Sequence, residues 1–174
     1  ILLEFADLMM DVLFSYLALY FVDVGHVTET QAGVAVTVWL AMGLITDFLF
    51  IPFIDRQKDS IRLLRTTALM ELVVFAAFLL IPGFIPKIAL VIAVNLLNTG
   101  WYPILQGRLY SSLPGQSASV MALGSVTAPL AKFFPFLLGF LADRFGLQAA
   151  MWLLLLGPLA LLVGLPRRHL TPDT

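Results

Sequence analysis

The stretch LQAAMWLLLLGPLALLVGL, residues 147–165, contains no charged side chain in 19 positions. A helix needs about 20 predominantly apolar residues to cross the hydrocarbon core of a bilayer, so this stretch predicts a transmembrane helix. It is the last of six such runs, which are separated where charged residues, proline and glycine cluster. The six predicted spans are residues 2–22, 32–54, 63–81, 87–107, 118–141 and 147–165.

The composition of the whole chain also indicates a lipid environment. Of its 174 residues, 60% are hydrophobic and 12% are charged, whereas soluble domains have about 45–50% apolar and about 25% charged residues. High hydrophobicity with a net charge of −1 excludes a disordered chain and leaves no basic surface for nucleic acid. We therefore expect an all-α, polytopic integral membrane protein whose six transmembrane helices form one bundle over residues 1–174.

The distribution of basic residues predicts the orientation of this bundle, because lysine and arginine are concentrated in cytoplasmic loops. One side carries seven of them, and the opposite side carries only Lys87 and Arg144. Both ends of the chain are therefore predicted to be cytoplasmic, and short loops without cysteine suit a bacterial inner membrane. The seven residues are Arg56, Lys58, Arg62, Arg65, Arg108, Arg167 and Arg168.

Two Asp-Arg pairs follow equivalent predicted spans, Asp55-Arg56 after the second and Asp143-Arg144 after the fifth. The pairs are 88 residues apart, which corresponds to half of the chain and to three spans. Because three is odd, the two triplets would cross the membrane in opposite senses, and such inverted three-helix repeats are typical of secondary transporters. Coincidence is the alternative explanation for two pairs alone. The predicted repeats are residues 1–85 and 86–174.

The residues around the second pair, Gly139-Phe140-Leu141-Ala142-Asp143-Arg144-Phe145-Gly146, resemble the G-x-L-A-D-R-x-G element of the major facilitator superfamily. The resemblance implies the C-terminal six-span half of a twelve-span transporter, with an N-terminal six-helix half as its missing partner. The first residue, isoleucine rather than methionine, agrees with this expectation. Lys58 departs from the family pattern, which has glycine there. The loop-motif and gating residues implied by the resemblance are Asp55, Arg56, Gly139, Asp143, Arg144 and Gly146.

Acidic residues form a stripe on the first predicted span. Glu4, Asp7, Asp11 and Ser15 are spaced by three, four and four residues, which places them within an arc of about 80° on a helix. A charge at membrane depth costs about 2.5–3.5 kcal/mol on insertion scales, so it usually faces a cavity or a partner. Solvation at the membrane surface is the alternative for Glu4 and Asp7. We predict ion coupling by Asp7 and Asp11, and a substrate cavity lined by Asp11 and Ser15.

A second, uncharged polar stripe lies on the fourth predicted span. Its amide, hydroxyl and phenol groups recur with helical spacing on one face. Such groups can hydrogen-bond a polar organic solute, but they can equally join helices to one another. In the resembled family the first and fourth spans of each half line the central cavity, which favours cavity lining. The predicted cavity residues are Asn95, Asn98, Thr99, Tyr102 and Gln106.

Lys132 lies within the fifth predicted span, with Ser125 seven residues earlier on the same face. A buried lysine must lose its proton or find a counter-charge, and a carboxyl in apolar surroundings can load and release a proton. We therefore predict that Lys132 takes part in ion coupling, with protons as the ion, and that Ser125 lines the cavity. A fixed ion pair that locks helices together is the alternative. The candidate partners of Lys132 are Asp7, Asp11, Asp47 and Glu71.

Asp47 and Glu71 have a further interpretation. Both lie in predicted spans toward their cytoplasmic ends, near the basic residues Arg62 and Arg65. Long charged side chains can reach the membrane surface while their stems stay in the apolar region. The two carboxyls could therefore extend toward the cytoplasmic interface.

Enzymatic activity is not expected. The two histidines, His26 and His169, lie in a loop and in the tail, so no metal triad or serine–histidine pair can form within the membrane. No cofactor or metal is predicted. The expected function is secondary active transport of a small organic solute by alternating access, in a lipid bilayer and with protons as the coupling ion. The alternative is a complete six-span scaffold or interaction subunit, or a homodimeric transporter.

Overall fold

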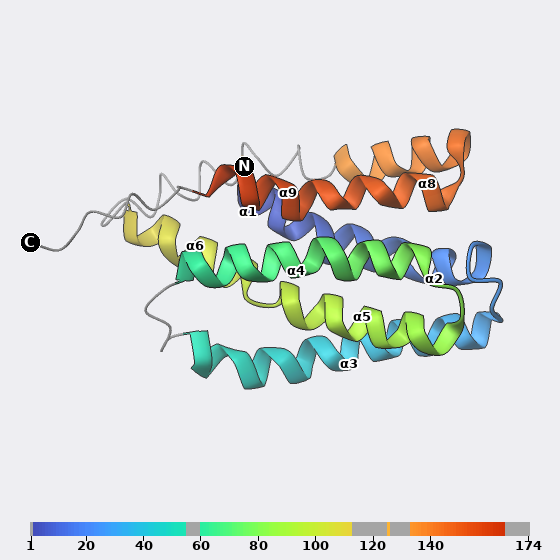
Figure 1. Ribbon diagram of the computed structural model, residues 1–174, viewed down its shortest axis with the longest axis horizontal. Coiled ribbons are helices and arrows are strands. Elements are labelled where there is room, and N and C mark those ends of the chain that lie inside the picture. Colours follow the sequence, from blue (N-terminus) through green and yellow to red (C-terminus); the bar gives the residue numbers. More distant parts are fainter. Residues whose placement is uncertain (1, 55–59, 113–124, 126–132, 166–174) are drawn as a thin grey trace, which may run out of the picture.

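The computed structural model of the chain describes residues 2–54, 60–112, 125 and 133–165, and its helices lie side by side along the long axis (Figure 1). Over these residues the chain consists of helices joined by short turns, and the described part contains no strand. The prediction of an all-α fold is confirmed for this part.

Five described segments are long and apolar enough to cross a membrane. They are Leu2–Asp23, Glu29–Leu49, Ser60–Leu80, Phe84–Ser112 and Leu147–Gly164. These segments match five of the six predicted spans. The remaining predicted span, residues 118–141, falls largely outside the described residues, so the count of six and the inverted repeat stay predictions.

Several spans are built from more than one helical element. The first contains α1 (Leu2–Asp7), the π-helical η1 (Leu8–Val12) and α2 (Leu13–Asp23). The second and third are α3 (Glu29–Ile54) and α4 (Ser60–Leu80), and the fourth contains α5 (Phe84–Asn98) and α6 (Trp101–Ser112). A helix at residues 133–145 precedes α8 (Leu147–Met151), the 3₁₀-helical η2 (Trp152–Leu155) and α9 (Leu156–Gly164).

Helix α3 begins three residues before the predicted span because a capping box defines its first turn. The Thr28 backbone N–H donates to Gln31 Oε1 at 3.1 Å, and the Gln31 backbone N–H donates to Thr28 Oγ1 at 3.3 Å. This reciprocal pair satisfies two N–H groups that have no partner within a helix. The polar residues at the start of the span therefore belong to the helix.

The fourth span is interrupted, whereas the sequence predicts one continuous run over residues 87–107. Helix α5 ends at Asn98 and α6 starts at Trp101, with a turn at Thr99 and Gly100. Pro103 has no N–H to donate to the Thr99 carbonyl, and glycine disfavours the helix interior. These two local effects explain why the helix breaks at this point.

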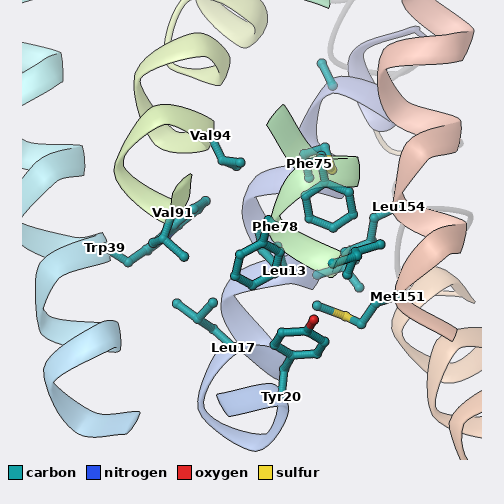
Figure 2. Packing of buried hydrophobic residues seen from close by; sticks show 14 of the residues in the cluster. Leu13, Leu17, Tyr20, Trp39, Phe75, Phe78, Val91, Val94, Met151 and Leu154 are labelled. Atoms are coloured by element: carbon teal, nitrogen blue, oxygen red, sulfur yellow. The ribbon is translucent and has the colours of Figure 1, made fainter. Parts of the chain in front are cut away.

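The helices are joined by a continuous apolar interior. Helix α5 packs against α3 and α4, while α9 packs against α1 and α4. The absence of a side chain at Gly157 permits the closest approach of α9 to α1, because a Cβ there would lie 2.9 Å from the Phe5 carbonyl oxygen. Figure 2 shows the interior side chains Leu13, Leu17, Tyr20, Trp39, Phe75, Phe78, Val91, Val94, Met151 and Leu154.

Large apolar side chains also cover much of the outer surface. Phe48 on α3 is 82% exposed and Val163 on α9 is 85% exposed. Extensive apolar patches are rare on soluble proteins and mark contact with lipid or with another protein. The outer surface is therefore consistent with an integral membrane protein, as the composition predicts.

Candidate functional site

The predicted acidic stripe lies on α1 and η1, at the start of the first span. Asp7 is half-buried and Asp11 is exposed. Glu4, Asp7 and Asp11 follow one another at intervals of three and four residues, which places them on successive turns of one helix face. A π-helical turn is rare and frequently marks a functional site, and here η1 begins directly after Asp7 and contains Asp11. Ser15 is exposed, and its hydroxyl donates to the Asp11 backbone carbonyl at 2.7 Å.

Helix α6 brings part of the second polar stripe to these acids. It packs against α1, which carries Glu4 and Asp7, and Tyr102 lies in its first turn. Tyr102 is 43% exposed and Gln106 is partly exposed one turn further along. The structure therefore places acids of the first span beside the phenol of the fourth, and we take Asp7, Asp11, Tyr102 and Gln106 as the candidate site.

The remaining residues of the second stripe point into the protein instead. Asn95, Asn98 and Thr99 are buried in or just after α5. The helix break at Thr99 and Gly100 separates them from the exposed residues on α6. The five predicted cavity residues thus divide into a buried group of three and an exposed group of two.

Two members of the buried group connect α5 to α3. Asn95 Nδ2 donates to the Trp39 carbonyl at 3.3 Å, and the Thr46 hydroxyl lies 3.3 Å from Asn95 Oδ1. The Thr99 hydroxyl lies 3.0 Å from Thr46 Oγ1. Asparagine and threonine here perform the alternative role that the sequence left open, which is hydrogen bonding between helices. Thr46 was not singled out by the sequence, although its position beside Asp47 in an apolar span was a usable signal.

The described part of the facilitator-like element has a structural role that can be read from its glycines. A Cβ on Gly139 would lie 2.9 Å from the Tyr16 hydroxyl oxygen, and that hydroxyl donates to the Pro135 carbonyl at 2.9 Å. Gly146 has a φ of +85°, which favours glycine. Asp143 is exposed, and the exposed Arg144 guanidinium lies 5.1 Å from the centre of the Phe140 ring.

Several other predicted residues cannot be compared in the same way. Asp55, Arg56 and Lys132 lie outside the described residues, so their gating and coupling roles stay predictions. Ser125 is described and exposed. Asp47 is exposed on α3.

Lys87, the first residue of the fourth predicted span, is buried within the described part of the bundle, although the orientation argument counts it at the membrane surface. It belongs to the first turn of α5 and is 4% exposed. Its ammonium donates to the Phe78 carbonyl at 2.6 Å and to the Tyr20 hydroxyl at 2.9 Å. Because Phe78 is in the last turn of α4, Lys87 supplies a cation and a donor where a helix leaves carbonyls unpaired. The uninterrupted apolar residues after Lys87 were the signal that it begins a span.

Glu71 does not extend toward the cytoplasmic interface. Its side chain is completely buried, and neither carboxyl oxygen has a hydrogen-bond partner among the described residues. Arg65, the nearer of the two predicted basic neighbours in sequence, donates from Nη2 to the Leu165 carbonyl at 2.8 Å. The arginine therefore binds the end of α9 and not the carboxyl.

Comparison with protein-family models, with curated proteins and with solved structures gives no match to this chain. The likeness to the major facilitator superfamily therefore rests on the residues of the element at 139–146 and on the pattern of spans.

Proposed function

We propose that this chain is the C-terminal half of a secondary transporter similar to the major facilitator superfamily. The transporter moves a small organic solute by alternating access and couples that movement to protons. The observation that carries the proposal is the grouping of Asp7, Asp11 and Tyr102 where α1 meets α6, on a bundle whose outer surface is otherwise largely apolar. Ionisable groups at membrane depth are costly and usually mark a pathway for ions or substrate.

The chemistry of these side chains suits the two tasks of a coupled transporter. The carboxyls of Asp7 and Asp11 are the groups proposed to exchange the proton, because an ionisable side chain at membrane depth usually serves an ion or a partner. The Tyr102 hydroxyl and the Gln106 amide can donate and accept hydrogen bonds from a polar solute. Since α6, which carries Tyr102, packs against α1, solute binding and proton binding would occur at adjacent sites.

The helix contacts support an inverted arrangement of two triplets. In the predicted repeat, the first, second and third spans correspond to the fourth, fifth and sixth. A contact between the first and sixth spans therefore predicts an equivalent contact between the fourth and third spans. Both contacts are present, as α1 with α9 and α4 with α5. The contact of α3 in the second span with α5 in the fourth span likewise predicts a contact between the fifth and first spans. Such a contact is made by the Tyr16 hydroxyl, which donates to the Pro135 carbonyl. The interrupted fourth span agrees with the discontinuous helices of many transporters.

The test is solute-driven proton movement by the parent protein, with both halves present, in liposomes that contain a pH-sensitive dye. Sugars, amino acids, nucleosides and organic acids are added singly to the outside. We expect one class to change the internal pH, and we expect Asp7→Asn and Asp11→Asn to reduce that signal to background. Asp23→Asn is the matched control, because Asp23 is exposed at the other end of the same span.

Equal signals from the unaltered protein and from both aspartate variants would contradict the coupling role. Transport by these 174 residues alone would favour the homodimeric alternative.

A further inference from the structure

A buried carboxyl group lies in the interior of the bundle, away from the candidate site. Glu71 belongs to a stripe of α4 whose other members are apolar, with Ala68 and Phe75 as its neighbours on the same face. Its exposure is 0%, and within the described part of the chain neither of its carboxyl oxygens has a hydrogen-bond partner. Burial of a polar group without a partner is costly, and burial of an ionised one costs far more. Glu71 therefore requires a local explanation.

The buried Asn98 amide on α5 lies at the same level along the bundle as Glu71 on α4. Trp101 Nε1 donates to Thr67 Oγ1 at 2.9 Å, which fixes the alignment of the fourth span with α4. Glu71 is four residues after Thr67, and Asn98 is three residues before Trp101. Because the two spans are antiparallel, Glu71 and Asn98 both lie about one turn from the Thr67–Trp101 hydrogen bond, in the same direction along the bundle. Asn98 is 2% exposed, and its Nδ2 has no hydrogen-bond partner among the residues that the structure describes.

Two irregular helical segments pack against each other and against the helices that carry these residues. The π-helical η1 packs against α5 and against the 3₁₀-helical η2, and η2 packs against α4. Figure 2 shows Phe75, Val94 and Leu154, neighbours of this region on α4, α5 and η2, in the interior. Irregular turns leave backbone carbonyls without their usual α-helical donors, and Pro158 cannot donate to the Leu154 carbonyl. An acceptor for a carboxylic O–H is therefore available from the backbone.

No charged side chain of the described residues compensates Glu71. On α5, Lys87 binds the Phe78 carbonyl and Tyr20, and on α4 Arg65 binds the Leu165 carbonyl.

The ionisable groups of the other neighbouring elements do not supply a cation either. On α1 and η1 these groups are the acids Glu4, Asp7 and Asp11. On α6 they are Tyr102, Tyr110 and Arg108, and Arg108 is exposed. The segment α8–η2–α9 contains no ionisable side chain.

We propose that Glu71 and Asn98 form a proton-binding site inside the bundle, distinct from the Asp7–Asp11 site. The carboxylate takes up one proton from the solvent, and the neutral carboxyl stays in the apolar interior. Rotation of either side chain would let Asn98 Nδ2 donate to the carbonyl oxygen of the carboxyl group. Its O–H would donate to a backbone carbonyl of an irregular segment.

Loss of this proton would change the packing of α4. An ionised Glu71 needs water or a cation, and Glu71 has neither solvent contact nor a charged partner among the described side chains of α4, α5 and η2. Deprotonation therefore favours a state in which α4 is separated from α5 near Glu71. The site can bind its proton whether or not the protein transports a solute, so this inference does not depend on the proposed function.

Infrared difference spectroscopy of the protein in lipid nanodiscs tests the proposal directly, with the pH as the variable. A protonated carboxyl has a C=O stretching band above the amide region, and we expect such a band to disappear as the pH is raised. Carbon-13 labelling of the glutamate carboxyl groups should shift the band. The chain has only three glutamates, Glu4, Glu29 and Glu71, so the label narrows the assignment without any substitution.

Three variants complete the assignment. The double variant Glu4→Gln, Glu29→Gln should keep the band, and Glu71→Gln should lose it. Asn98→Leu should move the band to higher frequency, because a carboxyl carbonyl that loses its hydrogen-bond donor has a stiffer C=O bond. This last shift separates a specific amide–carboxyl contact from burial alone.

The outcomes that overturn the proposal are equally specific. They are the absence of any label-sensitive carboxyl band in the unaltered protein, loss of the band in the Glu4→Gln, Glu29→Gln variant, or an unchanged band frequency in Asn98→Leu. The double variant decides the question even if Glu71→Gln fails to fold. A Glu71 band in a protein without solute-driven proton flux would leave this site standing and reject the proposed function.

Discussion

Asn95 and Asn98 are the same residue type on the same helix, one turn apart and almost equally buried, yet their environments differ. Asn95 is bound through both ends of its amide, to Thr46 and to the Trp39 carbonyl of α3. Asn98 Nδ2 has no partner among the described residues. The difference comes from the neighbouring helices. Helix α3 offers a hydroxyl and a carbonyl, while α4 presents Glu71 within an apolar stripe.

The comparison separates two uses of polarity inside a membrane bundle. A satisfied amide contributes to helix association, typically by about 0.6 kcal/mol for each hydrogen bond. A buried amide without a partner, such as Asn98, contributes no hydrogen bond in the present arrangement, and in the proposed proton-binding site it gains a partner when Glu71 is protonated. Residue type and burial alone do not distinguish these roles, so substitutions on the two faces of α5 should have different effects.

The largest effect on stability is expected at Lys87, which is buried on α5 like the two asparagines. Like Asn95, Lys87 has hydrogen-bond partners on neighbouring helices. Lys87→Met should lower the free energy of unfolding by about 1.5–3 kcal/mol, because charged hydrogen bonds are worth that much and the Phe78 carbonyl would lose its donor. Unfolding in mixed detergent micelles measures the change, with Arg62→Met, an exposed basic residue of α4, as the control. Equal stability of the Lys87 variant and the control would show that the Phe78 contact contributes little.

An intermediate effect is expected from the direct comparison of the two asparagines. Asn95→Leu should destabilise the protein by about 1 kcal/mol, because two hydrogen bonds to α3 are lost. Asn98→Leu should change stability by less than about 0.5 kcal/mol, because the one neutral hydrogen bond proposed to the Glu71 carboxyl is lost while the cost of burying an amide is removed. The same unfolding measurement serves both variants, and each is the control for the other. Equal losses would mean that Asn98 is hydrogen-bonded as fully as Asn95.

The sequence predicts the positions of the helices better than it predicts which helices pack against one another. The apolar runs identify the described spans because length and hydrophobicity determine which segments can cross a bilayer. The break at Gly100 was missed because the run remains apolar through it, and the early start of α3 was missed because Thr28 and Gln31 are polar. Both features follow from local hydrogen bonding, so close reading of capping and proline rules can recover them.

The contacts between helices are harder to predict, and Glu71 and Lys87 show why. In a soluble protein the buried face of a helix is its apolar face, but in a bilayer the lipid-facing side is apolar as well. Periodicity therefore does not say which stripe of α4 faces inward. Burial of Glu71 and Lys87 depends on which helices pack beside them, and that information is spread over the whole chain.

The smallest effect is expected at Glu71, and it has the opposite sign. Glu71→Leu should leave stability unchanged or raise it by up to about 1 kcal/mol, because an apolar side chain avoids the cost of burying a carboxyl, and this offsets the loss of the neutral hydrogen bonds proposed for that group. The measurement is made at acidic pH, where the carboxyl of the unaltered protein is neutral, with Glu71→Gln as the variant that keeps the polarity. A loss larger than that of Asn95→Leu would show that Glu71 is firmly hydrogen-bonded in lipid. In that case the contrast between the two faces of α5 would fail, because both would hold satisfied polar groups.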